Sequence, residues 1–184
     1  ATVELIDSYD VRIGMPQLGT CIARPAPTDL TCSTVLLFGF KRDLNAYLAA
    51  TPAAPSRTLA DVIAFNNAFV PPMKYGQVIA TGAEALDVSP GSADTARYQA
   101  DRAEDLRRSK LALDGVFDGP DGKQGTKDDF DAILHLGNAN ANVTAKAGYP
   151  SVAVPGGFNA LSSLTPADPP IGGPFPSGIT FARR

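Results

Sequence analysis

The pattern of apolar and polar positions predicts helices in the first two thirds of the chain. Apolar residues recur at helical spacing over Val35–Ala50 and over Asp94–Leu113, with charged residues between them. Shorter helical patterns begin at Arg57 and cover Gln77–Leu86. Clusters of Pro and Gly separate these segments and predict turns or irregular structure there.

The same spacing predicts which side chains face the protein interior. For the first helix the expected apolar face consists of Leu37, Phe40, Leu44, Tyr47 and Leu48, with Lys41, Arg42 and Asn45 on the other side. For the helix that begins at Arg57 it consists of Leu59, Val62, Ile63 and Phe65. The mixed charges over Arg102–Lys110 indicate a solvated helix face.

Short β-branched runs bounded by Gly and Pro predict strands, most of them in the last third of the chain. These runs are Phe130–Leu136, Ser151–Val154 and Pro176–Phe181, and the chain opens with a similar run at Ala1–Ile6. A Pro-Gly-Gly sequence is expected to end the second run. The expected helices and strands together place the chain in the α/β class. The strand candidates, about four, would form a sheet that the chain's own helices do not obviously cover on both faces.

Composition describes one globular domain, residues 1–184, with 44% hydrophobic and 19% charged residues. The net charge of −3 and the absence of a basic stripe argue against a nucleic-acid partner. No apolar run approaches the ~18 residues of a membrane span, so we expect no membrane association. The chain starts at Ala1 without Met, inside an apparent strand, which suggests a cut end.

The two cysteines, Cys21 and Cys32, bracket a loop that contains Pro25 and Pro27. Their spacing and the single histidine of the chain argue against a zinc site. They can form a disulfide in an oxidising compartment or remain free thiols in a reducing one. The sequence leaves both alternatives open, and with them a cytoplasmic or secreted location.

An Asp- and Gly-rich segment, residues 114–129, reads as an inserted loop. Its acidic residues include Asp118, Asp121 and Asp128, and flexible loops of this composition can supply the oxygen ligands of a calcium ion. The spacing does not match the calcium loop of an EF-hand. A solvated hairpin without metal is the simpler interpretation.

Several blocks, in order along the chain, resemble the C-terminal part of the amidase signature family. They are Phe40–Leu48 (FKRDLNAYL), Arg57–Asn66 (RTLADVIAFN), Tyr75–Gln77 (YGQ), Phe130–Leu134 (FDAIL), Ala147–Phe158 (AGYPSVAVPGGF) and Gly178–Phe181 (GITF). Gly39 departs from the family pattern, which often has Glu before the Phe-Lys pair. The 114–129 loop is not a family block either.

The resemblance implies a mixed sheet covered by helices and hydrolysis of a carboxamide through an acyl-serine, without a cofactor. The family uses two serines and a lysine, and its Gly/Ser-rich nucleophile loop has no counterpart in this chain. The one Ser-Ser pair, Ser162-Ser163, lacks flanking glycines, and Lys41 and Lys146 are interpreted as surface charges. We therefore expect no catalytic residue here and no activity of the chain alone; its expected partner is the N-terminal portion of the same amidase.

The loop after the first of the late strands borders the acyl pocket in the family. The resemblance therefore makes substrate neighbours of His135, Asn138, Asn140 and Asn142, although Asn and Gly are also what turns favour. A rival within the family is the A subunit of a tRNA-dependent amidotransferase. A rival from another class is a non-enzymatic binding or calcium-stabilised module, and a homodimer is a further possibility.

Overall fold

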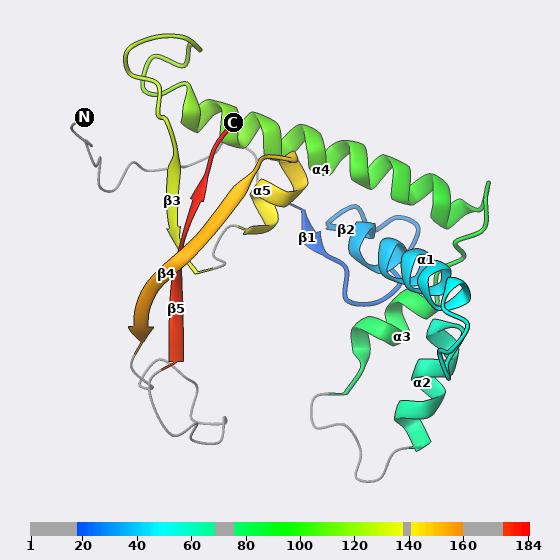
Figure 1. Cartoon of the computed structure of the whole chain (residues 1–184). Helices are drawn as coiled ribbons and strands as arrows, with labels where there is room; N and C mark the ends of the chain where they lie inside the picture. Colours follow the sequence, from blue (N-terminus) through cyan, green and yellow to red (C-terminus); the bar gives the residue numbers. More distant parts are fainter. Residues whose placement is uncertain (1–17, 69–75, 138–140, 160–174) are drawn as a thin grey trace. The chain divides into compact units, whose positions relative to one another are not determined.

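The structure, a computed structural model, describes residues 18–68, 76–137, 141–159 and 175–184 (Figure 1). The strand expected at Ala1–Ile6 lies outside these residues. The chain divides into two compact units, Leu18–Asp105 and a second one that includes Leu106–Arg184. Helix α4, Ala93–Phe117, belongs in part to each.

The Leu18–Asp105 unit is mainly helical. Its elements besides α4 are β1 (Gly19–Thr20), β2 (Cys32–Ser33), α1 (Val35–Ala50), α2 (Leu59–Ala68) and α3 (Val78–Glu84). The short strands β1 and β2 pair in parallel. The helices predicted from the sequence are confirmed, and α1 has the expected bounds (Figure 1).

The core of this unit differs from the expected one. It consists of Cys21, Leu37, Phe38, Leu59, Ala83 and Leu86. The expectation that Phe40, Tyr47 and Phe65 face inward was wrong, since all three are exposed. Phe38 is buried instead and stacks on Tyr98 of α4 with ring centroids 4.4 Å apart. The sequence offers two overlapping apolar stripes on α1, and packing against α4 selects the one that contains Phe38.

The side of α4 that faces this unit's interior is polar. Asp101 and Asp105 are buried, and they accept hydrogen bonds from Thr34 and Ser33 at the start of α1. Arg97 pairs with Asp101 at 2.8 Å. The expected solvated face over Arg102–Lys110 is thus partly wrong, because Asp105 and Ser109 are buried.

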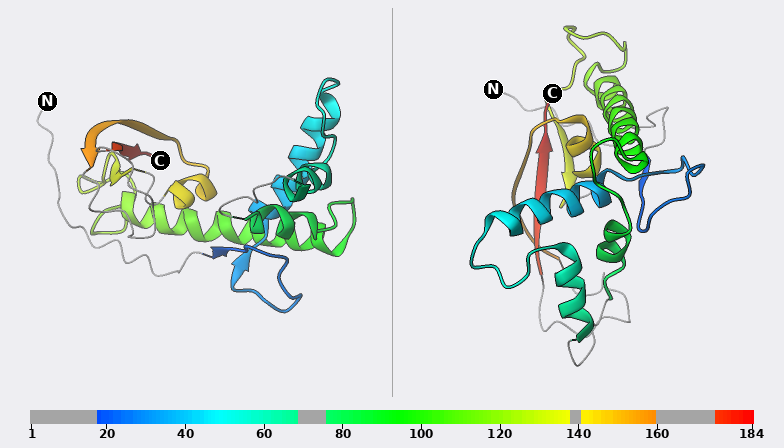
Figure 2. Two further views of the ribbon diagram at one scale, coloured as in Figure 1. Left: turned by 90° about the horizontal axis from the view of Figure 1, so that it is seen from below. Right: turned by 90° about the vertical axis from the view of Figure 1, so that its right-hand side faces the viewer.

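The second unit contains a three-stranded antiparallel sheet in the order β3-β5-β4. Its elements are β3 (Ile133–Leu136), α5 (Ala141–Ala147), β4 (Ser151–Asn159) and β5 (Phe175–Ala182). Figures 1 and 2 show α5 beside the last turns of α4. The strands predicted from the late apolar runs are confirmed, so the α/β class stands.

Some boundaries in this unit were predicted wrongly. The Pro155-Gly-Gly sequence does not end β4, which continues to Asn159 through an irregularity between Pro155 and Gly157. The stretch 141–147, expected as loop, is helix α5, since its alanines favour helix. The Asp- and Gly-rich loop begins after Phe117, so Asp114 lies on α4.

One face of the sheet is covered at β3 and β5, and the other face is open. Ile133 of β3 packs on a cluster of Leu113, Phe117, Val143 and Ala147 from α4 and α5. Because side chains alternate along a strand, His135, Thr180 and Ala182 share that face, and all three are buried. Leu134 and Phe181 lie opposite each other on the other face and are exposed.

Candidate functional site

His135, a predicted substrate neighbour, lies on the helix-covered face of the sheet. It pairs with Thr180 across β3 and β5, and its side chain is 8% exposed. Thr180 donates from its hydroxyl to the Gly137 carbonyl at 2.6 Å. Both ring nitrogens of His135 lack a hydrogen-bond partner in the described part of the structure. His135 is therefore a buried polar residue whose hydrogen-bonding capacity is unused.

The asparagines predicted beside it are placed only in part. Asn138 and Asn140 lie outside the described residues. Asn142 lies in the first turn of α5 and is exposed, so it is on a helix where a loop was expected. Within α5 it is Val143, Thr144 and Ala147 that are buried. Of the four predicted substrate neighbours, the structure thus describes His135 and Asn142, and these two side chains are not hydrogen bonded to each other.

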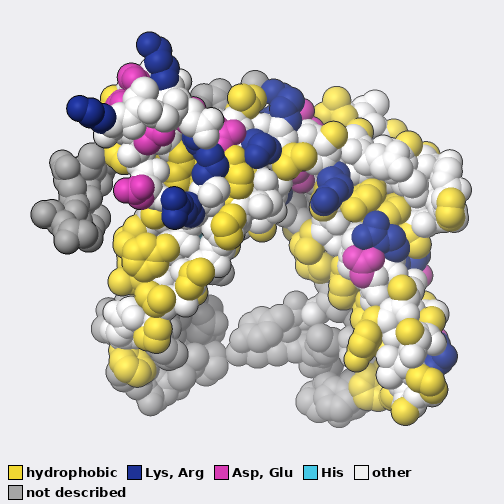
Figure 3. All heavy atoms as spheres, turned by 45° about the horizontal axis from the view of Figure 1, so that its top comes forward, with side chains coloured by type: hydrophobic (Ala, Val, Ile, Leu, Met, Phe, Trp, Pro, Cys, Tyr) yellow, Lys and Arg dark blue, Asp and Glu magenta, His cyan; other side chains and the backbone are white. Residues whose placement is uncertain are grey.

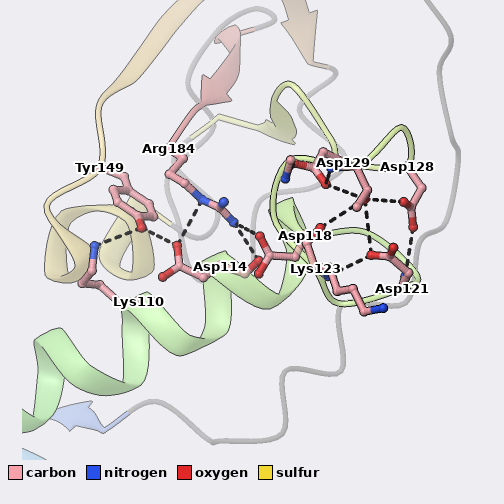
Figure 4. A network of polar contacts seen from close by, with 11 residues as sticks. Lys110, Asp114, Asp118, Asp121, Lys123, Asp128, Asp129, Tyr149 and Arg184 are labelled. Atoms are coloured by element: carbon pink, nitrogen blue, oxygen red, sulfur yellow. Dashed lines mark hydrogen bonds and ion pairs between the residues drawn. The ribbon is translucent and has the colours of Figure 1, made fainter.

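A polar network joins α4, the start of β4 and the end of β5 (Figure 4). The Tyr149 hydroxyl donates to the Asp114 carboxylate and accepts from the Lys110 ammonium at 3.0 Å. The same ammonium lies 4.4 Å from the centre of the Tyr149 ring. The hydrogen bond to Tyr149 raises the pKa of Lys110 above its usual range. This arrangement keeps Lys110 charged and holds the phenol in place.

Arg184 forms the other half of this network. Its guanidinium pairs with Asp118 and, at 3.3 Å, with Asp114, and it donates to the Asp114 carbonyl at 3.0 Å. The hydrogen bond to Asp118 raises the pKa of Arg184. Asp118, a predicted metal ligand, is thereby paired with a cation.

The other predicted metal ligands, Asp121 and Asp128, hydrogen bond within the loop between α4 and β3. The Thr126 hydroxyl donates to Asp128 at 2.6 Å, and the Asp121 amide donates to the same carboxylate at 2.9 Å. The bond from Thr126 lowers the pKa of Asp128, and the amide of Gly125 lowers that of Asp129. Among the described residues, no group of three or more His, Cys, Asp or Glu side chains is arranged to hold a metal ion.

A glycine fixes the path of this loop. Gly119 has φ +64°, and a Cβ atom there would lie 2.0 Å from the Asp128 carbonyl oxygen. The two ends of the loop therefore approach each other at a point where only glycine fits. Figure 4 shows the side chains of Asp121, Asp128 and Asp129 close together in this loop.

The other residues singled out in the sequence are the Ser-Ser pair, Lys41 and the two cysteines. Ser162 and Ser163 lie outside the described residues. Lys41 is not a surface charge, since its ammonium donates to the carbonyls of Glu84 and Leu86 at 2.7 and 2.9 Å. It thereby satisfies carbonyls at the C-terminal end of α3. Cys21 and Cys32, left open by the sequence, form a disulfide.

Sequence reasoning missed two features. The Tyr149 network was not foreseen, although Tyr149 follows a Gly that ends a helix and so marks a point where the chain returns to α4. The exposed apolar residues of the sheet were not foreseen either; an alternation of apolar side chains such as Leu134 and Leu136 is the signal that could have found them.

In the described part of the chain, no helix has the length and apolar character needed to cross a bilayer.

The chain is similar to known amidases in sequence and in fold. The chain is 31% identical over 157 residues to a probable amidase of Arabidopsis thaliana, a match that covers 84% of this chain and 26% of that protein. Its fold is similar to that of an amidase family protein from Bacillus anthracis, with a TM-score of 0.57 and 23% identity, over 81% of this chain and 25% of the other. No protein-family model matches the chain.

Both of these proteins are described as amidases, the family that the sequence blocks resemble. Because the chain spans about a quarter of the length of each of these proteins, neither match carries the activity of a whole amidase to it. The Arabidopsis protein shows sequence similarity over 84% of the chain, and the Bacillus anthracis protein shows a similar fold over 81% of it. The resemblance to the amidase family is thereby confirmed, over about a quarter of the length of each of these two proteins.

Proposed function

We propose that this chain serves as the C-terminal portion of an amidase. The reaction is hydrolysis of a carboxamide: water and the amide give a carboxylic acid and ammonia or an amine, through an acyl-serine. The observation that carries the proposal is the 31% identity to a probable amidase, which extends over 84% of the chain. The chain contributes sheet strands, covering helices and one wall of the substrate cleft.

The nucleophile and its base belong, in this proposal, to the remainder of the enzyme. A serine hydroxyl needs a base to remove its proton and backbone N–H groups to stabilise the oxyanion, and a Gly/Ser-rich loop supplies such donors. The described residues contain no such loop. The chain alone is therefore proposed to be inactive, with no cofactor needed for the complete enzyme.

His135, Asn138, Asn140 and Asn142 remain proposed substrate neighbours. The support for His135 is its buried position with two unpartnered ring nitrogens, which leaves it free to bond a polar group that reaches the helix-covered face of the sheet. Asn142 is supported only by its place in the sequence close to β3. Substitution of His135 in an active amidase is expected to raise KM.

The test is ammonia release from simple carboxamides such as benzamide and acetamide. Two proteins are compared: this chain, and a complex of this chain with the part of the Arabidopsis relative that it does not match. Release by the complex and none by the chain supports the proposal. Release by the chain alone would show that the nucleophile lies within it, and folded but silent samples of both would contradict the amidase assignment.

A further inference from the structure

The open face of the sheet carries two rows of apolar side chains. In the pairing register, Leu134, Phe181 and Val152 form one row across β3, β5 and β4. Leu136, Ile179 and Val154 form the next. Of these six, five are exposed, with Leu136 at 70% and Val152 at 62%, and Ile179 is partly buried. Figure 3 shows hydrophobic side chains at the surface over this part of the protein.

Such a face is unusual for a surface that meets water. An antiparallel sheet with one solvated face normally alternates apolar and polar residues, so that the outer face is polar. At these positions of β3 and β5 the usual arrangement is reversed. The polar residues His135 and Thr180 lie on the covered face, and the apolar residues Leu134 and Phe181 lie on the open face. Contiguous apolar patches of this kind mark interaction sites.

Strand β4 adds a second indication. It is an edge strand among the described strands of the sheet, and residues Ser151–Phe158 are exposed along its length on both faces. Edge strands are usually short, charged or covered, because their unpaired backbone groups bind other strands. In β4 the run Val152–Val154 is apolar and uncharged.

The partner that would cover this face is indicated by the share of its relatives' length that the chain spans. The chain spans 26% of its Arabidopsis relative and 25% of the Bacillus anthracis protein whose fold it shares. The rest of such a protein is large enough to supply a layer over this face, and burial of exposed Leu, Val and Phe side chains would stabilise its association. A partner of that origin accounts for the apolar rows and for the bare edge together.

We infer that the apolar rows on β3, β5 and β4 are the surface to which the remaining three quarters of an amidase binds, covering the sheet face opposite α4 and α5. This inference rests on the proposed function. It goes further by assigning the contact to a set of residues, Leu134, Leu136, Val152, Val154, Ile179 and Phe181.

The experiment measures binding of the full chain to one defined probe: the Arabidopsis amidase produced without the region that this chain matches. The variant Val152→Thr/Val154→Thr keeps the size and strand preference of the side chains and makes them polar. The control is Leu30→Thr, which replaces an exposed leucine (70%) in the Leu18–Asp105 unit. The Arabidopsis protein's own matching segment serves as the positive control. Circular dichroism and thermal unfolding establish that each variant is folded.

The expected result is binding of the chain and of the Leu30→Thr control, with at least a tenfold weaker Kd for the Val152→Thr/Val154→Thr variant. Hydrogen exchange on the unmodified chain, which needs no variant, should show β4 amides protected by the probe. Equal binding by the variant and the control would place the contact elsewhere and overturn the inference.

Other outcomes are equally decisive. A stable dimer of the chain that buries these rows and excludes the probe would assign the surface to a second copy. No binding, while the relative's own segment binds, would also overturn the inference. Binding at this face without ammonia release would leave the surface assignment intact and contradict the proposed function, so the two can fail separately.

Discussion

Ser33 donates a hydrogen bond of 2.6 Å to Asp105, across 72 positions of sequence. One turn earlier on α4, Asp101 accepts both the backbone amide and the hydroxyl of Thr34, each at 2.8 Å. Thr34 is the N-cap of α1, and its own side chain does not cap the helix. The start of α1 is thus capped by a carboxylate from another helix, which also places a negative charge near the positive end of the α1 dipole.

Replacement of Asp101 by alanine should destabilise the protein by about 3 kcal/mol, because it removes the acceptor of the Thr34 amide, the Thr34 hydroxyl and the Nε of Arg97. The measurement is urea unfolding followed by circular dichroism. Asp43→Ala, which removes an exposed pair with Arg42, is the matched control and should cost less than about 1 kcal/mol. Equal losses for the two variants would contradict the capping role.

Gly119→Ala should disrupt the loop between α4 and β3, since the added Cβ would lie 2.0 Å from the Asp128 carbonyl oxygen. Gly122→Ala is the control: it has nearly the same φ, +65°, but nothing within 4 Å of an added Cβ. The control should cost about 1 kcal/mol, the price of a left-handed alanine, and Gly119→Ala distinctly more. Thermal unfolding measures the loss of stability, and the NMR shift of the Thr126 amide reports the change in the loop. Equal losses for Gly119→Ala and Gly122→Ala would contradict the close approach of Gly119 to the Asp128 carbonyl.

The loop should lose its order in acid. Hydrogen bonds, from Thr126 to Asp128 and from the Gly125 amide to Asp129, lower the pKa of both carboxyls in the folded state. Their contribution is therefore complete above the unfolded pKa of about 3.9 and is lost as the pH falls through the lowered folded pKa. An NMR titration of the Gly125 and Thr126 amides measures this transition.

Thr126→Val tests the cause of that pH dependence. The Thr126 hydroxyl is the main cause for Asp128, whereas for Asp129 the main cause is the Gly125 amide, which the substitution keeps. The pKa of Asp128 should therefore rise more than that of Asp129. Equal shifts, or none, would show that the hydroxyl does not set the pKa of Asp128.

His135→Leu should raise the free energy of unfolding by about 1 kcal/mol, because it replaces a buried ring with unpartnered nitrogens by an apolar side chain of similar size. Leu136→Thr, at the exposed neighbouring position, is the control and should change stability by less than about 0.5 kcal/mol. Urea unfolding is again the measurement. A destabilisation would mean that the His135 ring has polar contacts that stabilise the fold.

Reduction of the Cys21–Cys32 disulfide should lower the stability by about 3 kcal/mol, the value expected for a loop of this length, since the cysteines are 11 positions apart. The measurement is urea unfolding with and without a reducing agent, with the thiols counted by mass spectrometry. The Cys21→Ala/Cys32→Ala variant should not respond to the reducing agent. A response of that variant would show that the agent acts on something other than the disulfide.

Helix positions followed from the sequence because apolar spacing and Pro or Gly breaks are local signals. The bounds of α1 and the existence of α3 and α4 were predicted in this way. Which stripe of α1 is buried was not, because Phe38 and Phe40 both fit a helical spacing and only packing against Tyr98 distinguishes them. Burial of Asp101 depends equally on its distant partner, Thr34.

The site was less predictable than the fold. His135 was expected as a substrate neighbour, but its burial and its two unpartnered ring nitrogens depend on residues distant in sequence, which no local pattern reports. Asn142 was placed on a loop because Asn and Gly surround it, whereas the alanines of 141–147 form a helix. The Arg184 pairs join residues 66 or more positions apart, which no local pattern reports.

Gly82 of α3 is a buried position where helix and loop touch. A Cβ atom there would lie 2.7 Å from the carbonyl oxygen of Ile22 and 2.8 Å from the Cα of Ala23, the residues that follow Cys21 in the disulfide loop. No side chain fits between the two backbones. A related chain with a larger residue at this position must therefore carry its Cys21–Cys32 segment along another path, so the identity of one helical residue predicts a loop conformation sixty positions away.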